Sequence, residues 1–279
     1  MEISYSLAIS YLLLGTAIGL VMWYAVAAFM QGEALQDSAS KVILIAFILA
    51  VVSIGFAIGH LGRMERFINL VSNPGSWLSR EGFFAGAFTA LVALYFFVLK
   101  KNGVENRKKG NVLIYLAALA GLCALISMGM IYATVQAVPA WNSTLVVLID
   151  VLSAIMLGGL LFLVLAGPTL PAPFTKTIAT AVFIILIAGI AVNIAYEVQV
   201  KMVLSALAAQ GAVVPSIWIG TLVRVIVGLL APAYLIYTSL KSGAEKQLSA
   251  FSIALICLVI GEIAGRLMHF VVAVKGPFF

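Results

Sequence analysis

Long apolar segments alternate with short groups of charged, proline and glycine residues along the whole chain. These segments lie at about 5–30, 42–61, 81–99, 111–138, 144–166, 176–200, 217–240 and 248–274. A helix of about 20 apolar residues crosses the hydrocarbon core of a bilayer. A helix also satisfies its own backbone hydrogen bonds in lipid, where no water is available to do so. The pattern therefore predicts an all-α integral membrane protein with eight transmembrane helices in a bundle.

The composition excludes a water-soluble globular protein. Of the 279 residues, 64% are apolar and 9% are charged, whereas roughly 25% of a soluble domain is charged. Eight spans leave no room for a separate soluble domain, so we expect residues 1–279 to form a single polytopic domain. The two cysteines, Cys123 and Cys257, lie inside apolar segments and are too few to hold an iron–sulfur cluster. We therefore expect any redox metal to be carried by a partner.

The basic residues are divided unequally between the two ends of the predicted bundle. The end with more of them carries Lys41, Lys100, Lys101, Arg107, Lys108, Lys109, Lys176, Lys241 and Lys246, and the other end carries Arg63, Arg66, Arg80, Lys201 and Lys275. Cytoplasmic loops of membrane proteins are rich in Lys and Arg. We therefore predict that both termini and the segment 62–80 lie outside the cytoplasm. No Lys or Arg precedes the first apolar segment, so we expect it to be a permanent span rather than a cleaved signal.

Ionisable side chains within the spans lie from the middle of the membrane outward. They are His60, Glu81, Asp150, Glu197, Arg224, Glu262, Arg266 and His269. Such residues are costly in lipid and usually face a cavity or a partner. Their common depth predicts one polar pocket that opens toward the outer side, and it argues against a charge relay across the whole membrane.

Each of these residues also has a purely structural interpretation. Glu262 and Arg266 have the i, i+4 spacing that allows an ion pair along one helix. Glu81 lies near an expected helix start, where a carboxylate is favoured by the helix dipole. Arg224 is a candidate counter-ion of Asp150 or Glu197, and His60 a candidate hydrogen-bonding group at the membrane interface.

The segment GHLGRMERFINLVSNPGSWLSREG (59–82) is unusual among the connections. Gly59 and Gly62 flank the end of the second apolar segment, where glycine allows a sharp turn or the close approach of a flat ligand. A flat apolar molecule with hydrogen-bonding edges would suit this segment.

Several motifs in this sequence resemble the DmsC family, the membrane-anchor subunits of anaerobic dimethyl sulfoxide reductase and related molybdoenzymes. They are His-Leu-Gly-Arg-Met-Glu-Arg (60–66), Leu-Ser-Arg-Glu (78–81), Val-Pro-Ala-Trp (138–141), Arg224 and Gly-Glu-Ile-Ala-Gly-Arg (261–266). They occur in the family's order and cover the whole chain. One departure is Met64, where the family usually has proline.

The resemblance implies a multi-pass anchor in the bacterial inner membrane that serves anaerobic respiration. It implies two partners, a molybdopterin catalytic subunit with a Mo-bis-pterin cofactor and a ferredoxin-like iron–sulfur subunit, and no heme in this chain. It also implies that the anchor oxidises menaquinol at the outer ends of helices two and three, with His60 and Glu81 as catalytic residues. Further expected contacts of the quinol are Gly62, Arg66, Arg224 and Glu262.

The chemistry of quinol oxidation agrees with these residue types. Two electrons and two protons must leave the ring, and an imidazole accepts a proton near neutral pH because its reference pKa is about 6.5. We expect His60 to accept the first hydroxyl proton and Glu81 to receive or relay a proton. Arg66 would stabilise negative charge on the ring.

Two other functions stay open at this point. His60 and His269 both lie in the outer half, so together they would be able to ligate one heme of a cytochrome b-type anchor. A secondary transporter is the other alternative, although such proteins usually show internal repeats and paired broken helices. Only Pro232 interrupts a span in this way.

Overall fold

The computed structural model describes residues 5–30, 35, 37–61, 73–102, 110–211, 214–241 and 244–273. The helices are α1 (Tyr5–Met30), α2 (Ala39–Leu61), α4 (Trp77–Asn102), α5 (Asn111–Ala133), α6 (Leu145–Ala166), α7 (Ala172–Ala209), α8 (Trp218–Leu222), α9 (Ala231–Ser239) and α10 (Ala244–Val271). The short 3-10 helix η3 (Gly167–Thr169) follows α6, and the π-helix η4 (Val223–Leu230) joins α8 to α9. Within these residues, eight helical stretches are long and apolar enough to cross a membrane, which confirms the predicted fold class.

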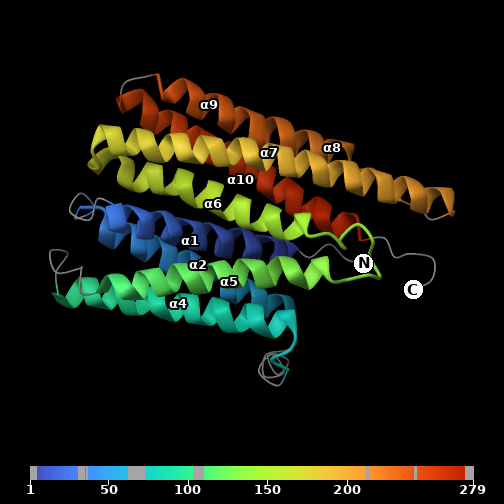
Figure 1. Ribbon diagram of the computed structural model, residues 1–279, viewed down its shortest axis with the longest axis horizontal. Helices are drawn as coiled ribbons and strands as arrows, with labels where there is room; N and C mark the ends of the chain where they lie inside the picture. Colours follow the sequence, from blue (N-terminus) through green and yellow to red (C-terminus); the bar gives the residue numbers. More distant parts are fainter. Residues whose placement is uncertain are drawn as a thin grey trace.

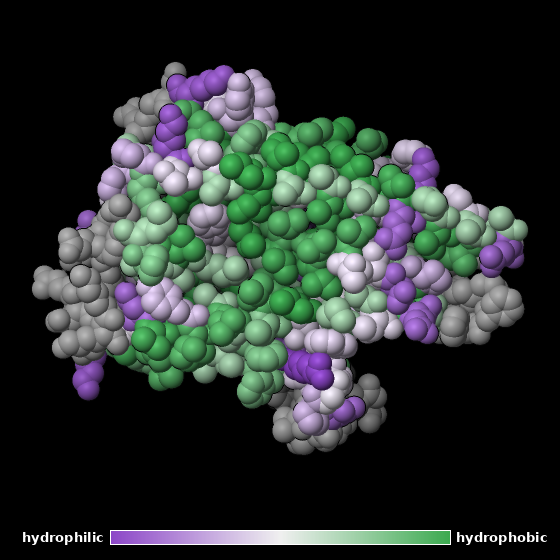
Figure 2. Space-filling model, in the orientation of Figure 1, coloured by the Kyte–Doolittle hydropathy of each residue, from purple (hydrophilic) through white to green (hydrophobic). Residues whose placement is uncertain are grey.

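The helices lie side by side as an elongated bundle (Figure 1). Helix α1 is central, because it packs against both α2 and α6. On one side of it α4 packs against α5, and on the other side α10 packs against η4 and α9. The start of α1 and the end of α10 lie toward the same end of the bundle. Apolar residues cover the middle of the visible face and hydrophilic residues gather toward its two ends (Figure 2), the distribution expected of a protein embedded in lipid.

Glycines allow α1 and α6 to approach closely at the centre of the bundle. A Cβ atom at Gly158 would collide with the backbone of Gly19 and Leu20, and a Cβ atom at Gly19 would collide with the backbone of Ala154. Small residues at helix interfaces of membrane proteins permit this kind of backbone contact. The contact fixes the position of the Asp150 end of α6 relative to α1.

We expect Gly158→Ala to destabilise the protein, because the added methyl group forces the two helices apart. Overpacking of this kind costs about 1–3 kcal/mol. Gly86→Ala is the matched control, since a Cβ atom at Gly86 meets nothing within 4 Å. Thermal unfolding of both variants in the same detergent checks the prediction, and equal midpoints would contradict it.

Several helix boundaries differ from the predicted ones. Helix α4 begins at Trp77 rather than residue 81, so Glu81 lies beyond its first turn. Helix α5 ends at Ala133, and residues 134–144 form a series of turns stabilised by short-range backbone hydrogen bonds. Helix α7 continues to Ala209 instead of ending near 200. Its 38 residues would measure about 57 Å, so its last turns extend beyond the other helices (Figure 1).

Candidate functional site

A small polar cavity lies between α1, α5, α6, α7, η4 and α10. Its volume is about 40 Å³. The polar side chains in its wall are Tyr11, Tyr132, Asp150, Tyr196, Arg224, Glu262, Arg266 and His269. Five ionisable residues that the sequence places at similar depth therefore surround one cavity, together with three tyrosines.

An ion pair crosses the cavity from α10 to α6. Arg266 Nη1 lies 3.3 Å from Asp150 Oδ1, and both residues are buried. The predicted pairing of Arg266 with Glu262 along α10 is wrong, since no ion pair within 4 Å joins these two described residues. The cause is the packing of α6 against α10, which brings Asp150 to the Arg266 guanidinium. Arg266 Nε and Nη2 have no hydrogen-bond partner among the described residues.

Arg224 is held in the first turn of η4 by packing rather than by a salt bridge. A Cβ atom at Gly265 would lie 2.6 Å from Arg224 Cζ, so the guanidinium lies directly over this glycine of α10. Within the described part of the protein, neither of the predicted counter-ions, Asp150 and Glu197, forms a direct ion pair with Arg224 at 4 Å or less, so Arg224 attracts them only over a longer distance. Glu197 instead accepts a hydrogen bond of 3.0 Å from Thr221 Oγ1. Among the described residues, the buried Arg224 Nε has no hydrogen-bond partner.

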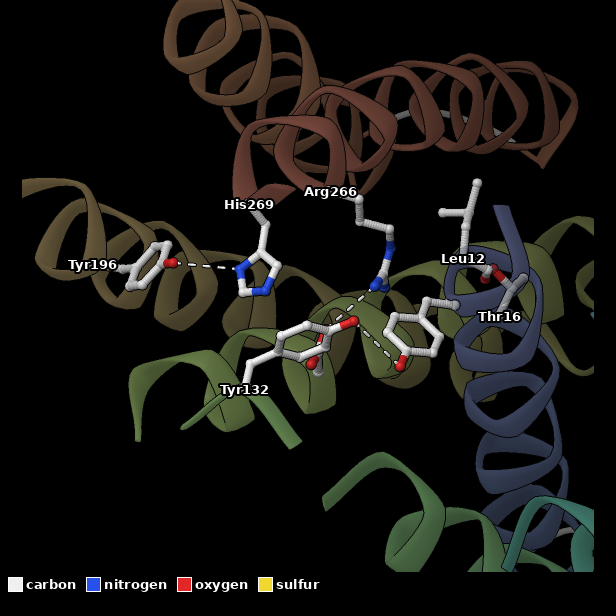
Figure 3. A network of polar contacts seen from close by, with 8 residues as sticks. Leu12, Thr16, Tyr132, Tyr196, Arg266 and His269 are labelled. Carbon is white, nitrogen blue, oxygen red and sulfur yellow. Dashed lines mark hydrogen bonds and ion pairs between the residues drawn. The ribbon is translucent and has the colours of Figure 1, made fainter. Parts of the chain in front are cut away.

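Aromatic side chains close the cavity toward the turns at 134–144. Tyr132 Oη donates to Tyr11 Oη at 3.5 Å. The His269 ring stacks on Trp141 with 5.2 Å between centroids and meets the edge of Tyr132 at 4.6 Å. Figure 3 shows Tyr132, Arg266 and His269 converging from two different helices, with Tyr196 beside His269.

Glu81 lies at the edge of this group. Its side chain is buried, and the Tyr11 hydroxyl is its hydrogen-bonding neighbour. Because the first turn of α4 contains no acidic residue, the interpretation of Glu81 as a helix-start carboxylate is wrong. Leu78, one turn before Glu81 on the same helix, is exposed, so Glu81 lies one turn from the lipid-facing surface of the bundle.

Comparison with known proteins now decides the family. The family model of the DMSO reductase anchor subunit (DmsC) matches residues 1–272. The chain belongs to the DmsC family. It is also similar to the C subunit of the anaerobic dimethyl sulfoxide reductase of Haemophilus influenzae, with 24% identity over 226 residues, covering 80% of this sequence and 78% of that protein. This DmsC protein is thus a multi-pass membrane-anchor subunit of the dimethyl sulfoxide reductase type.

The structure places some of the site residues predicted for a DmsC anchor at the cavity and others elsewhere. Arg224 and Glu262 line the cavity, and Glu81 lies beside Tyr11 at its edge. The side chain of His60, and residues Gly62 and Arg66, lie outside the described residues. Glu197 belongs to a separate open groove of about 550 Å³ beside Lys201 and Trp218.

Sequence reasoning missed the three tyrosines of the DmsC cavity. Tyr11, Tyr132 and Tyr196 are uncharged at neutral pH, so a search for charged groups within spans does not find them. The available signal was depth, because Tyr11 lies about as far from the start of α1 as Asp150 lies from the start of α6.

The surroundings of His269 do not favour the heme alternative. Trp141, Tyr132 and Phe270 pack around its imidazole, and the adjoining cavity of about 40 Å³ is far smaller than a heme. For the transporter alternative, Pro232 was the one candidate kink, and no paired interruption was found. In the structure α8, η4 and α9 follow one another from Trp218 to Ser239, and the π-helix η4 directly precedes Pro232 in the first turn of α9.

Proposed function

We propose that this anchor binds menaquinol beside Glu81 and His60, oxidises it and passes the electrons to an iron–sulfur subunit. That subunit and a molybdopterin catalytic subunit would complete a respiratory complex of the dimethyl sulfoxide reductase type in the bacterial inner membrane. The observation that supports this most is a buried carboxyl group, Glu81, in a family of anchor subunits, at the edge of a lipid-facing surface. A carboxyl group in this position has no ion-pair partner within the described residues.

The quinol ring fits the lipid-facing side of Glu81 better than the polar cavity. Pockets for small molecules usually measure about 300–1,000 Å³, and the cavity measures about 40 Å³. On the lipid side, Phe83 is 71% exposed. A Cβ atom at Gly55 of α2 or Gly86 of α4 would meet nothing within 4 Å. A ring arriving from the membrane therefore finds an apolar surface with one carboxyl group at its edge.

The roles of the protein groups follow from proton chemistry. Bound menaquinol supplies two electrons and two protons. His60 accepts a hydroxyl proton at its imidazole, and the Glu81 carboxylate accepts the second, as positioned general bases do. We assign Gly62 and Arg66 to contacts with the ring at the end of α2. We assign Arg224 and Glu262 to the polar surroundings of the site, because both line the cavity.

The iron–sulfur subunit should dock at the end of the bundle where α2 ends and α4 begins, here called the His60 end. Electrons must reach its clusters from the quinol, and His60 and Glu81 both lie at this end. Exposed Arg80 lies there with its guanidinium 4.4 Å from the Trp77 ring centroid. With the predicted orientation, this end lies outside the cytoplasm. Quinol protons are then released on the side where acceptor reduction consumes protons, and turnover is electrically neutral.

Site-specific crosslinking tests the docking side. We expect Arg80→Cys, labelled with a cysteine-reactive photocrosslinker, to form a covalent product with the iron–sulfur subunit. Lys101→Cys is the matched control, since it is exposed at the opposite end of the same helix. A product from Lys101→Cys and none from Arg80→Cys would show that the iron–sulfur subunit docks at the opposite end of the bundle, and would contradict the proposal.

Binding and turnover of a menaquinol analogue test the proposed function. The purified complex in lipid nanodiscs should bind the analogue saturably and use it to reduce dimethyl sulfoxide. The iron–sulfur subunit should copurify with the anchor. A complex that binds no analogue, or an anchor that purifies without redox subunits, would contradict the proposal.

A further inference from the structure

We propose that the last turns of α7, residues 202–209, bind the flank of the iron–sulfur subunit through an apolar contact without ion pairs. These residues are here called the α7 arm. The proposal rests on the proposed function, because that function places the iron–sulfur subunit at the His60 end. It adds a second contact surface on a different helix, and it states the chemistry of the partner surface that fits this arm.

Helix α7 is longer than a bilayer is thick. Its 38 residues measure about 57 Å, whereas a bilayer with its headgroups is roughly 40–45 Å thick. The other long helices have between 22 and 28 residues. Tilt does not absorb the difference, because α7 runs alongside its neighbours and only its C-terminal end extends beyond them (Figure 1). The excess of at least about 12 Å corresponds to roughly eight residues, the length of the α7 arm.

The α7 arm projects at the His60 end of the bundle. The end of α7, the start of α4 and the turns at 134–144 all lie toward this end (Figure 1). Glu81 lies near the start of α4, so the arm extends on the side where electrons are expected to leave the quinol. A subunit seated over Glu81 therefore has the α7 arm beside it.

The α7 arm does not have the composition of a helix that faces water. Residues 202–223 contain no Asp, Glu, Lys, Arg or His, although roughly a quarter of the residues in a soluble domain are charged. Met202 is 69% exposed, and Ala206, Ala208 and Ala209 are exposed as well. Contiguous apolar surface exposed to water marks an interaction site. Because the arm extends beyond the lipid, we infer that a protein covers it.

A groove beside the α7 arm offers space for side chains of that protein. Its volume is about 550 Å³, and its walls include Leu204 and Ala208 of the arm. Val214 and Pro215, in the segment that leads back to α8, form the opposite wall. Pockets of about 300–1,000 Å³ hold whole small molecules, so this groove accommodates apolar side chains of a partner.

The two charged residues of the groove precede the arm in α7 and are already engaged. Glu197 accepts a hydrogen bond of 3.0 Å from Thr221 Oγ1. The Lys201 ammonium group lies 4.8 Å from the centroid of the Trp218 ring. A charged partner residue buried against the arm would lose its hydration and find no opposite charge. The partner surface that fits the arm is therefore apolar.

Crosslinking in the complete complex in nanodiscs tests the position of the partner. Ala208→Cys, labelled with the same photocrosslinker as Arg80→Cys, should form a covalent product with the iron–sulfur subunit. Ile187→Cys is the matched control, because Ile187 is 47% exposed in the apolar part of the same helix. It should label lipid and no soluble subunit.

A charge placed in the contact tests its apolar character. Ala208→Lys should raise the dissociation constant of the soluble subunits from the anchor by about tenfold or more, because the ammonium group is buried without a partner. Thr177→Lys is the control, since it adds the same charge at an exposed position near the opposite end of α7. It should leave the dissociation constant unchanged. Mass photometry of the complex in nanodiscs at increasing dilution gives both constants.

The outcomes separate the arm from the proposed function. A product from Arg80→Cys and none from Ala208→Cys would overturn the arm and leave the docking end intact. So would an unchanged dissociation constant in Ala208→Lys, or a product of Ala208→Cys with lipid, the catalytic subunit or a second anchor in place of the iron–sulfur subunit. A complex that crosslinks through Ala208→Cys as expected but does not oxidise the menaquinol analogue would overturn the quinol site and support the arm.

Discussion

Replacing His60 by alanine should nearly abolish quinol oxidation and leave the complex assembled. His60 is the penultimate residue of α2, so its loss interrupts no helix and removes the expected proton acceptor for the quinol. Loss of a positioned general base typically costs 10²–10⁴-fold in rate, and we expect turnover to fall by about that factor. Steady-state oxidation of a menaquinol analogue by the purified complex measures this fall in turnover.

Two further variants separate loss of the base from loss of packing. His60→Gln keeps a polar side chain of similar size that cannot accept the proton, so it should be as slow as alanine. Ile58→Ala, a truncation on the same helix, should retain activity within a few fold. Activity close to that of the unmodified complex in His60→Ala would remove His60 from the mechanism.

Glu81→Gln should slow turnover by about 10²-fold or more while thermal stability changes little. The amide keeps the size of the side chain and its hydrogen bond with Tyr11, but it cannot accept a proton. Little stability should be lost through the helix dipole, because α4 begins at Trp77 and its first turn does not include Glu81. Turnover and thermal unfolding of the same preparation give the two values.

Glu197→Gln is the matched control for Glu81→Gln. It replaces a carboxylate of another helix that lies in the separate groove and accepts a hydrogen bond from Thr221. It should oxidise quinol at close to the unmodified rate. A Glu81→Gln variant that assembles poorly but turns over normally per assembled complex would show that Glu81 has a structural role only.

The predictability of this fold from sequence reflects the demands of lipid. Each apolar segment had to become a helix, since an unpaired backbone has no partner in the membrane. The end of α7 was missed because Glu197 and Lys201 interrupt the apolar pattern. The helix nevertheless continues to Ala209 and projects beyond the bundle (Figure 1).

The site was predictable in its position and not in its pairings. Counting depth along each span was enough to place Asp150, Arg224, Glu262, Arg266 and His269 at similar depth, and all five line one cavity. Sequence spacing identifies neighbours on one helix, so it proposed Glu262 for Arg266. The actual partner, Asp150, depends on which helix packs against α10 at that depth, and sequence spacing does not contain that information.

Electron transfer in a single turnover tests the proposed function most directly. Mixing the oxidised complex with a menaquinol analogue, without terminal acceptor, and following the iron–sulfur signals by rapid-freeze electron paramagnetic resonance reports whether electrons pass through this anchor. The clusters of the partner should become reduced in the unmodified complex and stay oxidised in His60→Ala over the same interval. Equal reduction in both, or none in the unmodified complex, would contradict quinol oxidation at the His60 end.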